Sequence, residues 1–171
     1  GNDVLALLPT GAGKSICFQV PALCKDGICI VISPLIALMN DQVSQLKHRG
    51  IKAEFISTGM SPKQIDYVLD NCIYGETKFL YLSPERLNSI FVKERLKLMN
   101  INFIAVDEAH CISQWGHDFR PAYRSVMQIR DWAPKASMIA VTATATKKVS
   151  NDIQLQLNFN KQNVIKTSFC L

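Results

Sequence analysis

The sequence predicts an α/β fold in which a doubly wound, mostly parallel sheet is flanked by helices. Three observations lead to this prediction. Apolar runs of strand length alternate with segments of helical spacing, a glycine-rich loop joins the first run to the first helix, and a later run ends in two carboxylates. Alternating strands and helices give parallel sheets with crossover helices. In such sheets ligands bind at the carboxyl ends of the strands, which is where the loop and the carboxylates fall.

Seven apolar runs are expected to form the strands. They are rich in Val, Ile, Leu and Phe and nearly continuous in apolarity, which is typical of parallel strands that are covered on both faces. The runs are 3–8, 28–33, 52–57, 79–83, 102–107, 137–142 and a weaker 163–167. Because there is no internal repeat and no linker, a single domain over residues 1–171 is the simplest organisation.

Helical spacing occupies the intervals between the runs. A first helix is expected directly after the glycine-rich loop, in the apolar stretch 16–20. Residues 35–48 and 146–157 carry apolar side chains at helical spacing. Residues 61–72 also do so and open with Ser61-Pro62, a good N-cap followed by proline in the first turn. These segments predict the helices that cover the sheet.

Composition narrows the class of protein. The chain has 171 residues, of which 48% are hydrophobic and 19% are charged, so it can bury a sizeable core. The net charge of +5 is compatible with a polyanionic partner without establishing one. The six cysteines form no CxxC pair, so we expect buried, reduced thiols rather than disulfides or a zinc site.

Targeting signals are not visible. No apolar run approaches the roughly 20 residues that a membrane span needs, so no membrane partner is expected. The first residues lack the basic region of a signal peptide. The first strand begins almost at the first residue, so we expect the chain to be a piece of a longer protein. The oligomeric state is not predicted.

The octapeptide Leu8–Ser15 lies between the first apolar run and the first helix. Its two glycines allow backbone N–H groups to converge on an anion. Lys14 can reach the outer phosphates, and Ser15 can place a hydroxyl on Mg²⁺. The cradle itself would consist of Thr10, Gly11, Ala12 and Gly13. The general phosphate-loop pattern has glycine where this chain has Leu8, and a surface turn is the alternative, which the flanking strand and helix patterns disfavour.

The run 102–107 ends in two neighbouring carboxylates. A carboxylate at a strand end can hold Mg²⁺ through its waters, which fits Asp107. The adjacent carboxylate can orient or polarise an attacking water, which fits Glu108. The alternative is an acidic strand end that caps the next helix. The glycine-rich loop disfavours that alternative, because two halves of one metal–phosphate site rarely occur together by chance.

The two motifs together resemble the Walker A and Walker B motifs of superfamily 2 helicases. In that superfamily the loop commonly reads Pro-Thr-Gly-x-Gly-Lys-Ser/Thr, so Leu8 is not a departure there, and the strand end reads Asp-Glu-Ala-His as it does here. The resemblance implies a RecA-like lobe of the P-loop NTPase class that uses ATP and Mg²⁺. It implies catalytic roles for Lys14, Asp107, Glu108 and His110, and metal binding by Ser15 and Asp107.

Residues 110–123 place three aromatic side chains, two histidines and an arginine in one loop. Such aromatics stack on unpaired bases or fill a satellite core, and composition alone slightly favours the core. The order Cys-Ile-Ser-Gln-Trp-Gly-His-Asp-Phe-Arg-Pro-x-Tyr resembles the aromatic-rich loop of RecQ-family DNA helicases, which senses single-stranded DNA and couples it to ATP hydrolysis. The resemblance implies DNA coupling by Trp115, Phe119 and Arg120, which Gln114, His117 and Asp118 would help to position.

Three further strand ends resemble motifs of the same family. Ser33 lies in a segment similar to motif Ia and would contact the DNA backbone, cap the following helix, or do both. Arg86 lies in a segment similar to motif Ib, where a phosphate contact and a solvated side chain are equally favoured. Thr142 lies in a segment similar to motif III, which links the nucleotide site to the DNA site. His110 would meet that motif.

The resemblance covers essentially the whole chain but only the first lobe of a helicase. It implies a 3′–5′ DNA helicase of repair and recombination that acts on single-stranded and forked DNA with its own second RecA-like lobe, which is absent here. The protein would be cytoplasmic and nucleoid-associated in a bacterium, or nuclear in a eukaryote. The isolated chain is expected to be inactive.

Two other functions remain open as alternatives. One is an RNA helicase of the DEAH or DEAD groups, which the loop 114–123 disfavours. The other is a non-catalytic nucleotide-binding scaffold, which the intact Lys14, Asp107 and Glu108 disfavour.

Overall fold

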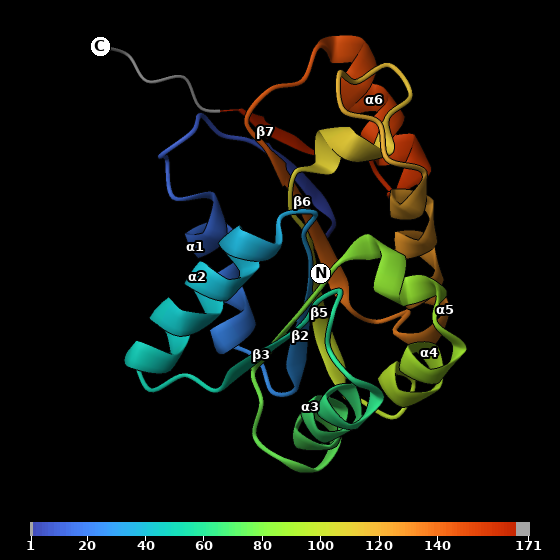
Figure 1. Ribbon diagram of the computed structural model, residues 1–171. Helices are drawn as coiled ribbons and strands as arrows, with labels where there is room; N and C mark the ends of the chain where they lie inside the picture. Colours follow the sequence, from blue (N-terminus) through green and yellow to red (C-terminus); the bar gives the residue numbers. More distant parts are fainter. Residues whose placement is uncertain (1, 167–171) are drawn as a thin grey trace.

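The computed structural model describes residues 2–166 and contains one seven-stranded sheet between two layers of helices (Figure 1). Every strand pairing in this range is parallel. The strands follow the order β3-β4-β2-β5-β6-β1-β7 across the sheet. Their bounds are β1 Val4–Leu7, β2 Ile28–Ile32, β3 Ala53–Ile56, β4 Phe79–Leu82, β5 Ile101–Val106, β6 Ser137–Thr142 and β7 Val164–Lys166. The predicted fold class is confirmed.

The helices that the sequence predicts are confirmed as α1, α2, α3 and α6, whereas two short helices and three 3-10 turns were not predicted. The helices are α1 Lys14–Leu23, α2 Ile36–His48, α3 Pro62–Tyr74, α4 Ile90–Leu96, α5 Gln128–Trp132 and α6 Lys147–Gln156. The 3-10 turns are η1 Pro84–Asn88, η2 Ala109–Ile112 and η3 Pro121–Met127. Helix α3 begins with the expected cap, because Ser61 and Gln64 exchange side-chain to backbone hydrogen bonds.

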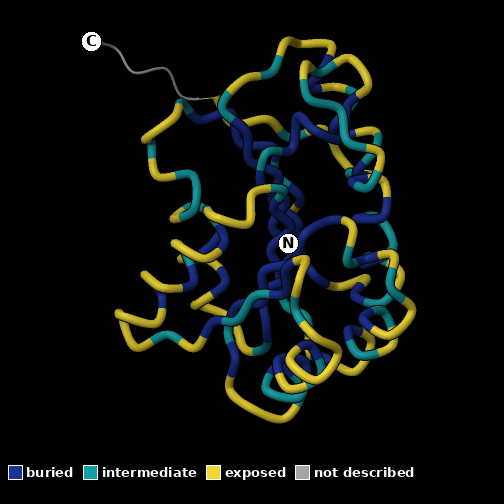
Figure 2. The backbone as a smooth tube through the Cα atoms, in the orientation of Figure 1, coloured by how far each residue is buried: buried dark blue, intermediate teal, exposed yellow. Residues whose placement is uncertain are grey.

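Side-chain alternation along the strands builds two cores. Cys29 and Val31 of β2 pack on the side covered by α1 and α2, whereas Ile30 and Ile32 pack on the side covered by α3 to α6 (Figure 1). Strands β2, β4 and β6 are buried along their whole length, and β5 is buried from Phe103 onward (Figure 2). Strand β7 differs from them, since all three of its residues are exposed at the sheet edge. Double coverage is therefore wrong for the run 163–167, whose last residue lies outside the described range.

The strand order brings four chain segments to one edge of the sheet. Strands β2, β5, β6 and β1 are consecutive neighbours, and all of them end at that edge. The Asp107 amide donates to the Ile32 carbonyl at 2.8 Å, and the Leu8 amide donates to the Thr142 carbonyl at 3.0 Å. The glycine-rich loop and the acidic strand end are therefore held in one plane, separated by the end of β6.

The cysteines of the described range are free thiols that differ in burial. Cys29, Cys72 and Cys111 are buried as expected, and Cys17 is half-buried. Burial is wrong for Cys24, which is exposed where α1 ends. Cys170 lies outside the described residues. None of the helices described within residues 2–166 combines the length and apolarity needed to cross a membrane.

Candidate nucleotide and nucleic-acid site

The glycine-rich loop turns sharply from β1 into α1. Gly11 and Gly13 have φ of 82° and 76°, in the left-handed region that glycine adopts without strain. No side chain caps α1, which leaves its positive N-terminal end to face an anion. Leu8 is 8% exposed and belongs to the core beneath α1, which explains an apolar residue at this position. The geometry fits the predicted phosphate cradle.

Asp107 is a buried carboxylate with few partners. It is 4% exposed, it accepts from the Glu108 amide at 2.9 Å, and the Ser33 hydroxyl lies at 3.5 Å. Burial, together with the neighbouring charge of Glu108, raises the pKa of Asp107 to about 6. The Lys14 ammonium acts in the opposite direction and lowers the pKa of both carboxyls. The charge of Lys14, at the start of α1, therefore acts on both carboxyls at the end of β5.

A divalent cation fits this donor set. The Ser15 hydroxyl and the Asp107 carboxylate are oxygen donors of the kind that Mg²⁺ prefers. A buried carboxylate whose pKa is raised lacks a full complement of partners for its charge, and a bound cation would supply one. Lys14 and the start of α1 would hold the phosphates of a nucleotide next to it.

We expect Mg²⁺-dependent nucleotide binding to weaken as the pH falls from 7.5 to 5. Asp107 gains a proton as the pH falls through its raised pKa of about 6, and the neutral acid cannot attract a cation. The fraction of charged Asp107 then falls about tenfold, and affinity for the magnesium nucleotide falls with it. Titration of a fluorescent ATP analogue with Mg²⁺ at both pH values measures this effect. The Asp107→Asn variant should lose this component of the pH dependence, and an unaltered profile in that variant would contradict the assignment.

Glu108 is linked to the end of β6 through a buried histidine. The His110 Nδ1 lies 3.2 Å from the Glu108 Oε2 and 2.8 Å from the Thr142 Oγ1. The hydrogen bond from His110 is the main cause that lowers the pKa of Glu108, which keeps this carboxylate charged. Glu108 has φ of 47°, an uncommon conformation for a residue with a side chain. The expected contact between His110 and the 142 segment is present.

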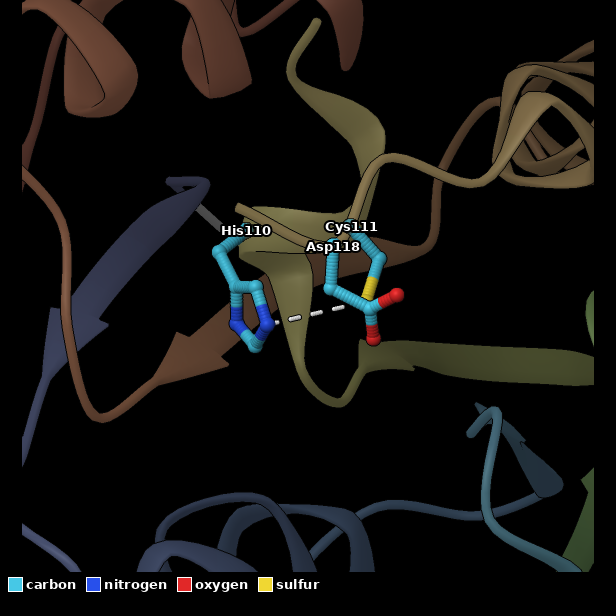
Figure 3. A group of neighbouring side chains, drawn as sticks. All are labelled: His110, Cys111 and Asp118. Carbon is cyan, nitrogen blue, oxygen red and sulfur yellow. Dashed lines mark hydrogen bonds between the residues drawn. The ribbon is translucent and has the colours of Figure 1, made fainter. Parts of the chain in front are cut away.

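A hydrogen-bonded chain leads from His110 into the aromatic-rich loop 110–123. Figure 3 shows His110, Cys111 and Asp118 facing one another. The Cys111 Sγ lies 3.7 Å from the His110 Nε2 and donates to the Asp118 Oδ2 at 3.6 Å, and Asp118 accepts from the Arg120 Nη2 at 3.2 Å. Burial and Asp118 raise the pKa of Cys111 to about 12, so the thiol keeps its proton. Polar contacts thus connect Glu108 with Arg120.

The same three side chains form a possible soft-metal cluster. Their ligand atoms all lie within 4.8 Å of one another, and His, Cys and Asp are the donors that Zn²⁺ takes. Each of them already has a partner in the hydrogen-bonded chain, and Asp118 is paired with Arg120. The contacts are therefore explained without a metal ion.

The loop is fixed at both ends to the acidic strand, whereas its tip is open to solvent. The buried Tyr123 hydroxyl donates to the Asp107 carbonyl at 2.9 Å. A Cβ on Gly116 would lie 2.7 Å from the His110 carbonyl oxygen, so only glycine allows this close approach. Trp115 is 62% exposed, and the satellite-core alternative is therefore wrong for it. Phe119 is half-buried, with the Arg124 guanidinium 5.4 Å from its ring centroid.

Three other predicted site residues lie in this loop or at the end of β2. The exposed His117 stacks on His110 with ring centroids 4.7 Å apart, and Gln114 is exposed. Ser33 is 1% exposed, and the expected cap is wrong because Leu35 precedes α2 without any side-chain cap. Strand β2 carries Ser33 inward, next to Asp107, instead of outward toward the helix start.

Arg86 is half-buried and donates to the Ser57 carbonyl at 2.5 Å. The solvated side chain expected as one alternative is therefore wrong for it, and its DNA contact stays a prediction.

Sequence reasoning assigned no role to four residues that hold the loop. They are Cys111, Ser113, Lys148 and Asp152, and all of them contact residues of the loop or lie within it. Cys111 could have been suspected from its place beside His110. The contacts of Lys148 and Asp152 had no local signal, because the residues they touch lie more than 30 positions away in the sequence.

Comparisons with known proteins agree with this arrangement. A protein-family model described as DEAD/DEAH box helicase matches residues 1–153. The ATP-dependent DNA helicase RecQ of Bacillus subtilis (strain 168) is 48% identical over 169 residues, which are 98% of this chain and 29% of that protein. The RecQ helicase of Haemophilus influenzae is 46% identical over 171 residues, 99% of this chain and 27% of that protein. The resemblance to RecQ helicases is confirmed, and the chain spans less than a third of these relatives.

Solved structures of low identity share the fold. The Pyrococcus furiosus Hef helicase domain matches with a TM-score of 0.70 at 19% identity. The match spans 96% of this chain and 35% of the Hef chain. The DUF1998 helicase MrfA, solved bound to DNA, has a TM-score of 0.75 at 20% identity, with 97% of this chain and 23% of its own covered. These likenesses support the architecture, whereas the roles of the site residues stay predictions.

Proposed function

Because the chain belongs to the DEAD/DEAH box helicase family, we propose that it is the ATP-binding lobe of a RecQ-like 3′–5′ DNA helicase. The full-length protein would couple Mg-ATP hydrolysis to translocation on single-stranded DNA and to the opening of forked duplexes in repair and recombination. The observation that best supports this proposal is the chain of polar contacts from Glu108 to Arg120, which runs through His110, Cys111 and Asp118. It joins the nucleotide side of the lobe to a loop with an exposed tryptophan.

On the nucleotide side, each group has a task that its geometry supports. Lys14 and the loop 10–13 bind the phosphates, and Ser15 and Asp107 would hold Mg²⁺, which neutralises phosphate charge when bound. Glu108 stays charged because of His110 and orients the water that attacks the γ-phosphorus. The products are ADP and inorganic phosphate. An arginine from a second lobe would complete the site in the full-length protein.

On the DNA side, the loop 110–123 offers an aromatic face and a cation. An unpaired base stacks on the exposed Trp115, and Arg120 contacts a phosphate once it releases Asp118. Release of Asp118 alters its contact with Cys111 and thereby the setting of His110 beside Glu108. Binding of DNA to the loop thus changes the surroundings of Glu108 through neighbouring polar contacts.

The proposal predicts that DNA stimulates ATP hydrolysis by the full-length protein more strongly than RNA of the same length and sequence. Phosphate release is measured over a titration of each strand, and the Glu108→Gln variant is the control without turnover. A preference for RNA would favour an RNA helicase of the DEAH or DEAD groups. Nucleotide binding that no nucleic acid stimulates would favour a scaffold. Strand separation of a fork with a 3′ single-stranded arm, compared with a 5′ arm, tests the direction.

A further inference from the structure

Helix α6 holds the exposed Trp115 at two points. We propose that Asp152 of this helix is a positioning residue that sets the main chain of Trp115 for stacking with a base. The inference rests on the proposed DNA function and adds a residue that no helicase motif above contains. Asp152 contacts neither nucleotide nor DNA in this proposal and acts through Ser113.

The first contact is a buried hydroxyl between the helix and the loop. The Ser113 Oγ donates to the Asp152 Oδ2 at 2.6 Å and accepts from the Trp115 amide at 3.2 Å. Ser113 is fully buried, so water does not compete for its hydroxyl. A hydroxyl that donates to a carboxylate is polarised and becomes a better acceptor for the amide. Asp152 therefore fixes the backbone from which the tryptophan ring projects.

The second contact is to the ring itself. Lys148 lies four residues before Asp152, which places both side chains on one face of α6. The Lys148 Nζ is 3.3 Å from the centroid of the Trp115 ring. Main chain and ring are thus held by the same helix, although the side chain is 62% exposed. An aromatic group held in advance loses less conformational freedom when a ligand binds.

The position of α6 in the chain connects its two contacts with the Trp115 loop to the nucleotide side of the lobe. The helix begins at Lys147, five residues after Thr142, whose hydroxyl contacts His110. The last residue of β6 therefore contacts His110 beside Glu108, and the helix that follows contacts the Trp115 loop through Lys148 and Asp152. The Gln156 Nε2 donates to the second oxygen of Asp152 at 3.4 Å, which fixes the carboxylate on the helix.

The test uses the full-length protein and the DNA concentration that gives half-maximal ATPase stimulation. Asp152→Ala is expected to raise this concentration about tenfold, the scale of one lost hydrogen bond to a charged group. The DNA-independent rate and the KM for ATP should stay unchanged. Asp152→Asn keeps an oxygen that accepts from Ser113 and should restore most of the wild-type response. The neighbouring exposed Asn151→Ala is the matched control.

A double-mutant cycle separates positioning from a merely structural role. In a Trp115→Ala background, Asp152→Ala should have no further effect on the half-maximal DNA concentration. The same effect in both backgrounds, or no effect in the wild-type background, would overturn the inference. Ser113→Ala breaks the same contact from the loop side and decides the matter if Asp152→Ala does not fold. A wild-type protein that DNA does not stimulate would instead refute the proposed function.

Discussion

The 171-residue chain alone should hydrolyse ATP at least about 1000-fold more slowly than the full-length protein with saturating single-stranded DNA. An arginine supplied to the γ-phosphate by a partner domain is worth about 10³–10⁵ in rate, and we propose that it comes from a second lobe. The chain corresponds to 29% of the Bacillus subtilis relative, so most of such a protein lies outside it. Arg120, which lies in the loop 110–123, is paired with Asp118.

Single-turnover phosphate release from both proteins, with and without DNA, measures this difference. Circular dichroism tests whether the isolated chain is folded. Binding of a fluorescent nucleotide tests whether its glycine-rich loop binds phosphates. Slow turnover together with measurable binding is the expected result. Robust DNA-stimulated turnover by the isolated chain would contradict the proposal and would place every hydrolytic group within these residues.

The parts of the site that sequence predicts are those encoded in contiguous residues. A phosphate cradle needs a strand, two glycines and a helix start, and all of them lie between Val4 and Leu23. The acidic strand end is equally local. A parallel sheet then brings the two segments to one edge without further information, since its strands all end on the same side. The fold class, four helices and the cradle follow from such patterns.

The parts that sequence does not predict depend on which strands are neighbours and on what each loop rests upon. Ser33 looks like a helix cap in the sequence, but the pairing of β2 with β5 places it beside Asp107. Composition slightly favours burial of Trp115, whereas Trp115 is 62% exposed and Tyr123 of the same loop is buried. The contact between Ser113 and Asp152 joins residues 39 positions apart, which no local pattern encodes.

Replacement of Lys14 by alanine in the full-length protein is expected to lower the DNA-stimulated turnover number at least about 100-fold, the scale of one lost preorganised electrostatic contact. In the proposed function Lys14 has two effects. Its ammonium would neutralise phosphate charge as the bond to the γ-phosphorus breaks. It also lowers the pKa of Asp107 and Glu108, so its loss raises both pKa values and leaves Asp107, whose pKa is already about 6, less charged at neutral pH.

The two effects of Lys14 are separable by measurement. Steady-state phosphate release at saturating ATP and DNA gives the turnover number. Its pH profile should move toward higher pH in the Lys14→Ala variant, because Asp107 then has a higher pKa and loses its proton at a higher pH. Lys63→Ala removes an exposed lysine from α3, on the opposite side of the sheet from α1, and should leave turnover unchanged (Figure 1). Turnover by Lys14→Ala within a few-fold of wild type would exclude this loop as the phosphate site. A large loss with an unshifted pH profile would retain Lys14 as a phosphate contact and remove its influence on Asp107.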